Sequence, residues 1–160
     1  MSHTDIESRE NFLFTLEWLL AVTKRYAANV RFGLVRISFA DPEKLGDLFG
    51  AQEAAHKLDD ILHCLNKAFR KTDLVARDGV DFWILVPYTS TDEKLADRVR
   101  YIINIASQVG LEIVERDISL FPLPLDRHDM GDDFSAVEFL AYLKNNHDTL
   151  ASHEFALLPQ

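Results

Sequence analysis

The chain has 160 residues, 48% of them hydrophobic, which is enough apolar material for the core of one domain over residues 1–160. Its 26 acidic and 17 basic residues give a formal net charge of -9, which argues against nucleic acid or an anionic membrane as the partner. The single cysteine, Cys64, excludes a disulfide framework within the chain. Since the sequence also shows no targeting or membrane-spanning run, we expect a soluble, cytoplasmic protein.

Hydrophobic periodicity in the first half of the chain predicts three helices and a strand. A helix is expected over residues 9–26, and the apolar run 30–39 suits a central strand. Pro42 fits the first turn of a short helix, and a longer helix should follow over residues 52–70. The predicted buried stripe of that longer helix consists of Ala55, Leu58, Ile61, Leu62, Leu65 and Phe69.

Two short β-rich runs predict a hairpin in the middle of the chain. They cover residues 72–76 and 82–86, and the segment between them contains Gly79, which suits a turn. The two tryptophans, Trp18 and Trp83, are expected in the core, since large aromatic residues are usually buried.

The second half predicts a helix over residues 91–110, a strand over 111–120, an acidic loop over 122–133 and a helix over 135–145. No element is expected beyond that helix. Adjacent strands after two helices do not suit a doubly wound sheet. The order therefore predicts an α/β fold with a central, mixed antiparallel sheet of about five strands and helices on both faces.

The segment 70–87 resembles the core of the GGDEF family of diguanylate cyclases, in which R-x-x-D-x-x-x-R precedes a GG(D/E)EF hairpin, a hydrophobic strand and a proline. The hairpin motif is one residue shorter here and consists of Gly79, Val80, Asp81 and Phe82. The resemblance extends to Thr4, Arg9, Phe12 and residues 47–50. It implies the GGDEF, nucleotidyl-cyclase-like fold.

The same resemblance implies that catalytic positions have changed. Ser38 and Ala40 stand where the family places two metal-binding aspartates, and neither supplies the anionic oxygen that magnesium prefers. Gly46 and Ala55 replace the residues that read guanine, and Val80 stands where triphosphate approaches the backbone. We therefore expect no enzyme activity, no bound metal ion and no cofactor.

One family site is retained in the sequence. Arg70 and Asp73 match the R-x-x-D pair that binds the product cyclic di-GMP, Arg100 matches a second arginine, and Arg98 is its neighbour. An arginine fork can bind guanine or phosphate, and a carboxylate can accept from the guanine N–H edge. The resemblance thus implies an inactive cyclic di-GMP receptor that signals to a protein partner or within a homodimer.

Other interpretations of these residues stay open. The basic end of the helix before Asp73 can complement the helix dipole, and Arg70 and Asp73 can form a local ion pair without any ligand. The chain can also be a ligand-independent interaction or dimerisation module, or keep residual cyclase activity. His56, Asp60 and His63 share one helix face, which makes a metal site possible, although a solvated helix face is the simpler interpretation.

Overall fold

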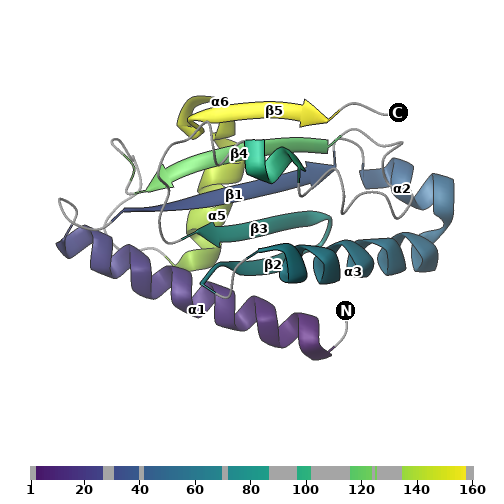
Figure 1. The fold of residues 1–160 in the computed structure, drawn as a ribbon, viewed down its shortest axis with the longest axis horizontal. Coiled ribbons are helices and arrows are strands. Elements are labelled where there is room, and N and C mark those ends of the chain that lie inside the picture. The colour runs from purple at the N-terminus through teal and green to yellow at the C-terminus, as the bar shows by residue number, and fades with distance from the viewer. Residues whose placement is uncertain are drawn as a thin grey trace.

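Figure 1 shows the computed structural model of the chain, which describes residues 3–26, 31–39, 42–69, 72–86, 97–101, 116–123, 125 and 135–157. The helices are α1 (His3–Arg25), α2 (Pro42–Phe49), α3 (Ala51–Ala68), α5 (Ala136–Asn145) and α6 (His147–Leu150). The strands are β1 (Phe32–Phe39), β2 (Leu74–Asp78), β3 (Asp81–Val86), β4 (Arg116–Leu123) and β5 (His153–Leu157). Residues 97–101 are also helical.

The five strands form one sheet in the order β2-β3-β1-β4-β5, and every neighbouring pair is antiparallel. Strand β1 lies in the middle, and its residues Leu34 and Val35 are fully buried on opposite faces. The near-continuous apolar run that predicted a central strand reflects this burial on both sides. The predicted α/β fold with about five strands is confirmed.

Helices cover both faces of the sheet, as the sequence predicted (Figure 1). On one face, α2 and α3 pack through Leu45, Leu58 and Leu65 against a cluster that includes Val35 and Ile84. On the other face, α1 and α5 enclose a second cluster, which consists of Phe12, Leu16, Phe32, Leu34, Ala76, Trp83, Leu85, Phe121, Leu123, Ala136, Phe139, Leu140 and Leu143. Side chains alternate along each strand, so every strand contributes to the face on which its register places it.

The hairpin between β2 and β3 is tighter than predicted. Asp78 pairs directly with Asp81, which leaves a loop of two residues, Gly79 and Val80. Gly79 has a φ of 65°, and a glycine with positive φ at the first loop position is typical of a type II′ turn. Because the turn is short, β2 and β3 reach closer to it than the predicted strand ends at residues 76 and 82.

The C-terminal part of the fold departs most from the prediction. Strand β4 runs through Pro122 to Leu123, whereas residues 122–133 were expected to form a loop. Strand β5 pairs with β4 only up to Leu120, so Pro122 lies where β4 has a single neighbour and a missing N–H is tolerated. Strand β5 itself was not predicted, because His153 and Glu154 interrupt its apolar pattern.

Three further differences concern the helices. Helix α1 begins at His3, earlier than the predicted residue 9. Its Trp18 is 59% exposed and does not belong to the core, so the expectation for this tryptophan was wrong, while Trp83 is buried as expected. Ala54, and not Ala55, is buried on α3.

Helix α5 begins where the sequence predicted. Ser135 accepts a hydrogen bond from the backbone N–H of Glu138 at 3.2 Å, and Glu138 accepts in return from the backbone N–H of Ser135. This capping box satisfies two backbone donors at the helix start. Within the described helices, none combines the length and apolar character that crossing a bilayer requires. That residues 1–160 form a single domain stays a prediction.

Candidate functional site

The hairpin places two carboxylates side by side at one edge of the sheet. Asp78 and Asp81 are direct cross-strand partners, so their side chains project from the same face, roughly 5 Å apart at Cβ. This is the face covered by α1 and α5, since it also carries Ala76 and Trp83. Like charges directly opposite each other destabilise a strand pair. Each carboxylate therefore needs a cation of its own.

Asp81 is buried and contacts two cations from distant parts of the chain. Lys144 of α5 donates to Oδ2 of Asp81 at 2.9 Å, and the Arg36 guanidinium of β1 lies 3.5 Å from Oδ1. The side chain of Arg36 is only 9% exposed. Because a buried charge without a counter-charge is costly, Asp81 and Arg36 require each other inside the fold.

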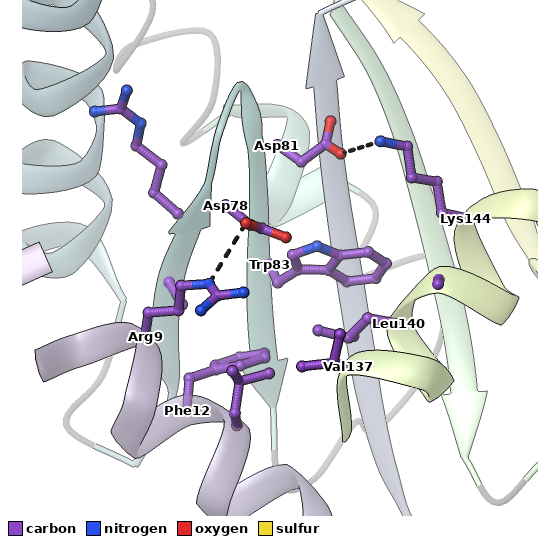
Figure 2. Close-up of a pocket in the computed structure, with 12 residues that line it drawn as sticks. Arg9, Phe12, Asp78, Asp81, Trp83, Val137, Leu140 and Lys144 are labelled. Carbon is purple, nitrogen blue, oxygen red and sulfur yellow. Dashed lines mark hydrogen bonds and ion pairs between the residues drawn. The ribbon is translucent and has the colours of Figure 1, made fainter. Parts of the chain in front are cut away.

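Asp78 lies at the surface and contacts α1. Its Oδ1 is 3.4 Å from Nε of Arg9, and its side chain is 60% exposed. The ion pairs that Arg9 and Lys144 form lie at the mouth of a cavity of about 220 Å³. Figure 2 shows Trp83 between α1 and α5, with Phe12 and Leu140 lower in the view. Helix α1 supplies one wall of this cavity and α5 the opposite wall. The hairpin base thus joins charged groups to an apolar pocket.

The sheet register places further polar side chains in the same row. Ser38 on β1 pairs with Asp81 on one side and with Asp117 of β4 on the other. All of these side chains project from the face of the sheet that carries Trp83. Asp81 and Asp117, on the two neighbouring strands, therefore flank Ser38, whose side chain has only a hydroxyl group. Ala40 lies outside the described residues.

The structure describes part of the site that the sequence predicts for cyclic di-GMP. Asp73 is buried, with a side chain only 3% exposed, and its Oδ2 lies 3.6 Å from the guanidinium of Arg98. The side chain of Arg98 is 33% exposed and stacks over the ring of Phe69 at 5.2 Å. Arg100 lies two residues after Arg98, on the same helical turn. Its side chain is half exposed and contacts Asp97 at 3.7 Å. The structure therefore brings Asp73 and Arg98 together.

Some predicted residues fall elsewhere. Arg70 lies outside the described residues, as do residues 102–115. In the hairpin motif, Val80 is half-buried against the α2 and α3 cluster, and Phe82 is fully buried in it. His56 and Asp60 form an exposed ion pair at 3.7 Å. Across the parts of the chain that the structure describes, no three His, Cys, Asp or Glu side chains gather in a way that would hold a metal ion.

Sequence reasoning missed the partners of Asp81. The sequence patterns assigned no role to Arg36, which lies in an apolar strand, or to Lys144 of the last helix. A signal was present, since a charged residue in the middle of a buried strand requires a buried counter-charge. The period of two places Arg36 and Ser38 on one face. Only the register with β3, however, identifies Asp81 as the partner.

Comparisons with solved structures place this fold among GGDEF domains. The GGDEF domain of YfiN (TpbB) from Pseudomonas aeruginosa has a TM-score of 0.60 and 19% identity, and the match covers 88% of this chain and 78% of that chain. The GGDEF domain of DgcB from Caulobacter crescentus, in complex with c-di-GMP, has a TM-score of 0.62 and 12% identity, covering 88% and 82%.

A third structure is the diguanylate cyclase SiaD of Pseudomonas aeruginosa with its activator SiaC, with a TM-score of 0.61 and 19% identity, covering 89% of this chain and 52% of that chain. At these identities the likeness concerns the fold. A comparison with curated protein sequences found no match.

The family comparison corrects one expectation. The model that matches residues 2–119 is described as "Diguanylate cyclase, GGDEF domain", which contradicts the prediction that the chain is not an enzyme. That prediction judged Ser38 along its own strand, whereas Asp81 and Asp117 reach the same row from neighbouring strands. Since the match spans more than half of the sequence and agrees with the fold, the chain belongs to the GGDEF domain family.

Proposed function

We propose that this GGDEF domain is a cytoplasmic receptor that binds cyclic di-GMP through Arg70, Asp73, Arg98 and Arg100 and signals to a protein partner. The observation that carries the proposal is the pair formed by Asp73 and Arg98. The Asp73 side chain is almost fully buried, while the Arg98 side chain beside it is one third exposed. A charged donor is therefore held in place by the fold and still reaches the surface.

The surroundings of Arg98 suit a guanine dinucleotide. An arginine presents five N–H donors in a planar fork, and Asp73 lies along one side of that fork. Phe69 supports the guanidinium from below, which limits the rotamers that binding would have to freeze. Arg100 adds a second guanidinium, on a half-exposed side chain within the same helical turn.

The free energy of binding indicates how many contacts the site must provide. A hydrogen bond to a charged group contributes about 1.5–3 kcal/mol, so two arginines supply about 3–6 kcal/mol. Micromolar binding needs roughly 8 kcal/mol. Arg70, Asp73 or base stacking must supply the difference. DgcB of Caulobacter crescentus, a GGDEF domain of the same fold, was crystallised with c-di-GMP, which supports this choice of ligand.

Titration calorimetry with cyclic di-GMP tests the proposal on the full chain. We expect binding that weakens by roughly tenfold or more in Arg98→Gln, because one charged hydrogen-bonding group is lost. Arg25→Gln is the matched control, since Arg25 is an exposed arginine on α1 whose guanidinium stacks on Tyr26. No heat at high micromolar ligand, or unchanged affinity in both Arg98→Gln and Arg70→Ala, would refute the proposal.

A second candidate function is favoured by the surface of α1. Phe14 is 76% exposed and Trp18 is 59% exposed, and they lie one helical turn apart on the same side. Two large exposed aromatic residues on one helix face indicate a contact with another protein. SiaD was crystallised with its activator SiaC, so a domain of this fold can occur in a protein complex.

Charge along α1 favours a second copy of the chain as that partner. Acidic residues lie in the first half of the helix, where Glu10 is exposed, and Lys24 and Arg25 are exposed in its last turn. An antiparallel pair of α1 helices brings the acidic part of one copy beside the basic end of the other. Such a dimer requires no nucleotide.

Sedimentation analysis of the wild type and of Trp18→Gln tests this second candidate. We expect the wild type to dimerise without ligand and the variant to be monomeric, since the variant removes the larger of the two aromatic contacts. Val137→Gln, which changes an exposed apolar residue on α5, serves as the control and should leave the dimer intact. A wild type that stays monomeric at high concentration would rule the dimer out.

A further inference from the structure

The cavity between α1 and α5 is not used by the proposed nucleotide site. It has a volume of about 220 Å³, and its lining includes Phe12, Trp83 and Leu140 but none of the residues proposed to bind cyclic di-GMP. Figure 2 shows the indole ring of Trp83 between the two helices, with the Lys144–Asp81 pair above it and the Arg9–Asp78 pair to its left. The cavity thus has an apolar floor and a charged mouth.

Two cations that are not sealed inside the fold, Arg9 and Lys144, line the mouth of the cavity. Arg77 also lines the cavity, but its guanidinium contacts Asp59 of α3 on the opposite face of the sheet. The remaining charged lining groups are two cations, Arg9 and Lys144, and two carboxylates, Asp78 and Asp81. Since the buried Arg36 also contacts Asp81, the mouth is less acidic than the chain as a whole, whose net charge is -9.

Arg9 is the cation best placed to receive an anion. Its side chain is partly exposed, and its contact with Asp78 at 3.4 Å is long and lies at the surface. A surface ion pair of this kind contributes little to stability, so the guanidinium can turn to a new partner at low cost. Lys144 is about half exposed and can share its three donors between Asp81 and a ligand.

We propose that this cavity binds a small monoanion with an apolar body, of the class of aryl carboxylates, with the ring against Trp83 and the carboxylate at Arg9 and Lys144. The volume supports the size of the ligand. An apolar cavity of about 150 Å³ accommodates benzene, so 220 Å³ accommodates one ring with a short carboxylate-bearing chain. A dinucleotide such as cyclic di-GMP is too large for it.

The position of the cavity gives binding a consequence for the hairpin. Lys144 donates to Asp81, which lies immediately after the two-residue turn, and Arg9 contacts Asp78 immediately before it. A carboxylate that draws both cations toward itself weakens their hold on the two hairpin aspartates. The ligand would therefore loosen the contacts between the hairpin, α1 and α5.

The two tryptophans provide a direct measurement. Trp18→Phe leaves Trp83, which lines the cavity, as the only tryptophan of the full chain. Titration of this variant with 3-phenylpropionate should change the Trp83 emission and saturate with a Kd of roughly 1 mM or tighter, as suits so small a ligand. The neutral amide of the same acid should bind at least roughly tenfold more weakly, because it lacks the negative charge.

Two further substitutions in that background locate the ligand. Arg9→Gln should weaken the acid roughly tenfold and leave the amide unaffected, while Arg25→Gln, on the same helix but away from the cavity, should change neither. Ala141→Phe places a ring at the mouth from an exposed position on α5, so it should block both ligands without disturbing the core.

The proposal is overturned if 3-phenylpropionate gives no saturable change up to about 10 mM, well above the expected Kd. It is equally overturned if the acid binds Ala141→Phe as well as it binds the parent. Equal affinity for acid and amide would reject an anion as the ligand. None of these results depends on whether cyclic di-GMP binds at Asp73 and Arg98.

Discussion

Two buried carboxylates, one on the sheet and one just before its edge strand, are neutralised in different ways. Asp81, on the face of α1 and α5, contacts Arg36, which is buried in the central strand, and Lys144 from α5. Asp73, just before β2, contacts Arg98, whose side chain is one third exposed. One carboxylate is held mainly by a cation inside the fold, and the other by a cation at the surface.

This difference separates a structural role from a binding role. A cation that is sealed in the fold cannot be shared with a ligand without exposing its partner. A cation at the surface can be solvated or bind a ligand while the carboxylate beside it remains in place. By this criterion Arg36 and Asp81 maintain the hairpin, and Arg98 is the group that can meet a nucleotide.

The largest expected effect comes from removing the sealed carboxylate. Asp81→Ala leaves the buried guanidinium of Arg36 without its counter-charge and should lower the free energy of unfolding by about 3–5 kcal/mol. Urea denaturation followed by circular dichroism measures the change. The control is Asp78→Ala, its direct cross-strand partner, which is largely exposed and should cost no more than about 1 kcal/mol.

Equal losses in these two variants would contradict the assignment of Asp81 as a sealed partner. They would show that the burial of Asp81 does not increase its contribution to the free energy of unfolding above that of Asp78. A loss confined to Asp81→Ala would instead tie the hairpin to β1 and α5 through this one carboxylate.

Sequence patterns predicted the elements whose residues repeat regularly. Alternation and three- to four-residue spacing located β1, α3 and α5 within a few residues, because burial of one face imposes those periods. Strand β5 could not be found in this way. It lies at the sheet edge and is short, and its His153 and Glu154 carry no strand signal.

The sites were less accessible to sequence reasoning than the elements. Asp73 could be singled out from a motif, and the structure places it beside Arg98. The group of Arg36, Asp81 and Lys144 joins residues 45 and 63 positions apart, and no periodicity connects such positions. The register of the antiparallel strands brings these residues together. Register depends on the length of the turn, and the sequence did not predict the two-residue turn of the hairpin.

An intermediate effect is expected at the surface-facing pair. Asp73→Ala removes a buried carboxylate, but Arg98 can then turn to water, so the loss should be about 1–3 kcal/mol, smaller than for Asp81→Ala. The same urea titration measures it. Asp97→Ala, which removes the exposed partner of Arg100, should stay within about 0.5 kcal/mol. A loss at Asp73 equal to that at Asp81 would remove the contrast between the two carboxylates.

The smallest effect is expected at Lys144, and it decides which cation maintains Asp81. Lys144→Ala removes a hydrogen bond of 2.9 Å, but Arg36 remains in contact with the carboxylate and Lys144 is half exposed. The loss should therefore be about 0–1 kcal/mol in urea titrations, and it should shrink further at high salt, which screens exposed charges. A loss near that of Asp81→Ala, independent of salt, would mean that Lys144 and not Arg36 neutralises the hairpin. In that case Lys144 would not be available to a ligand in the cavity.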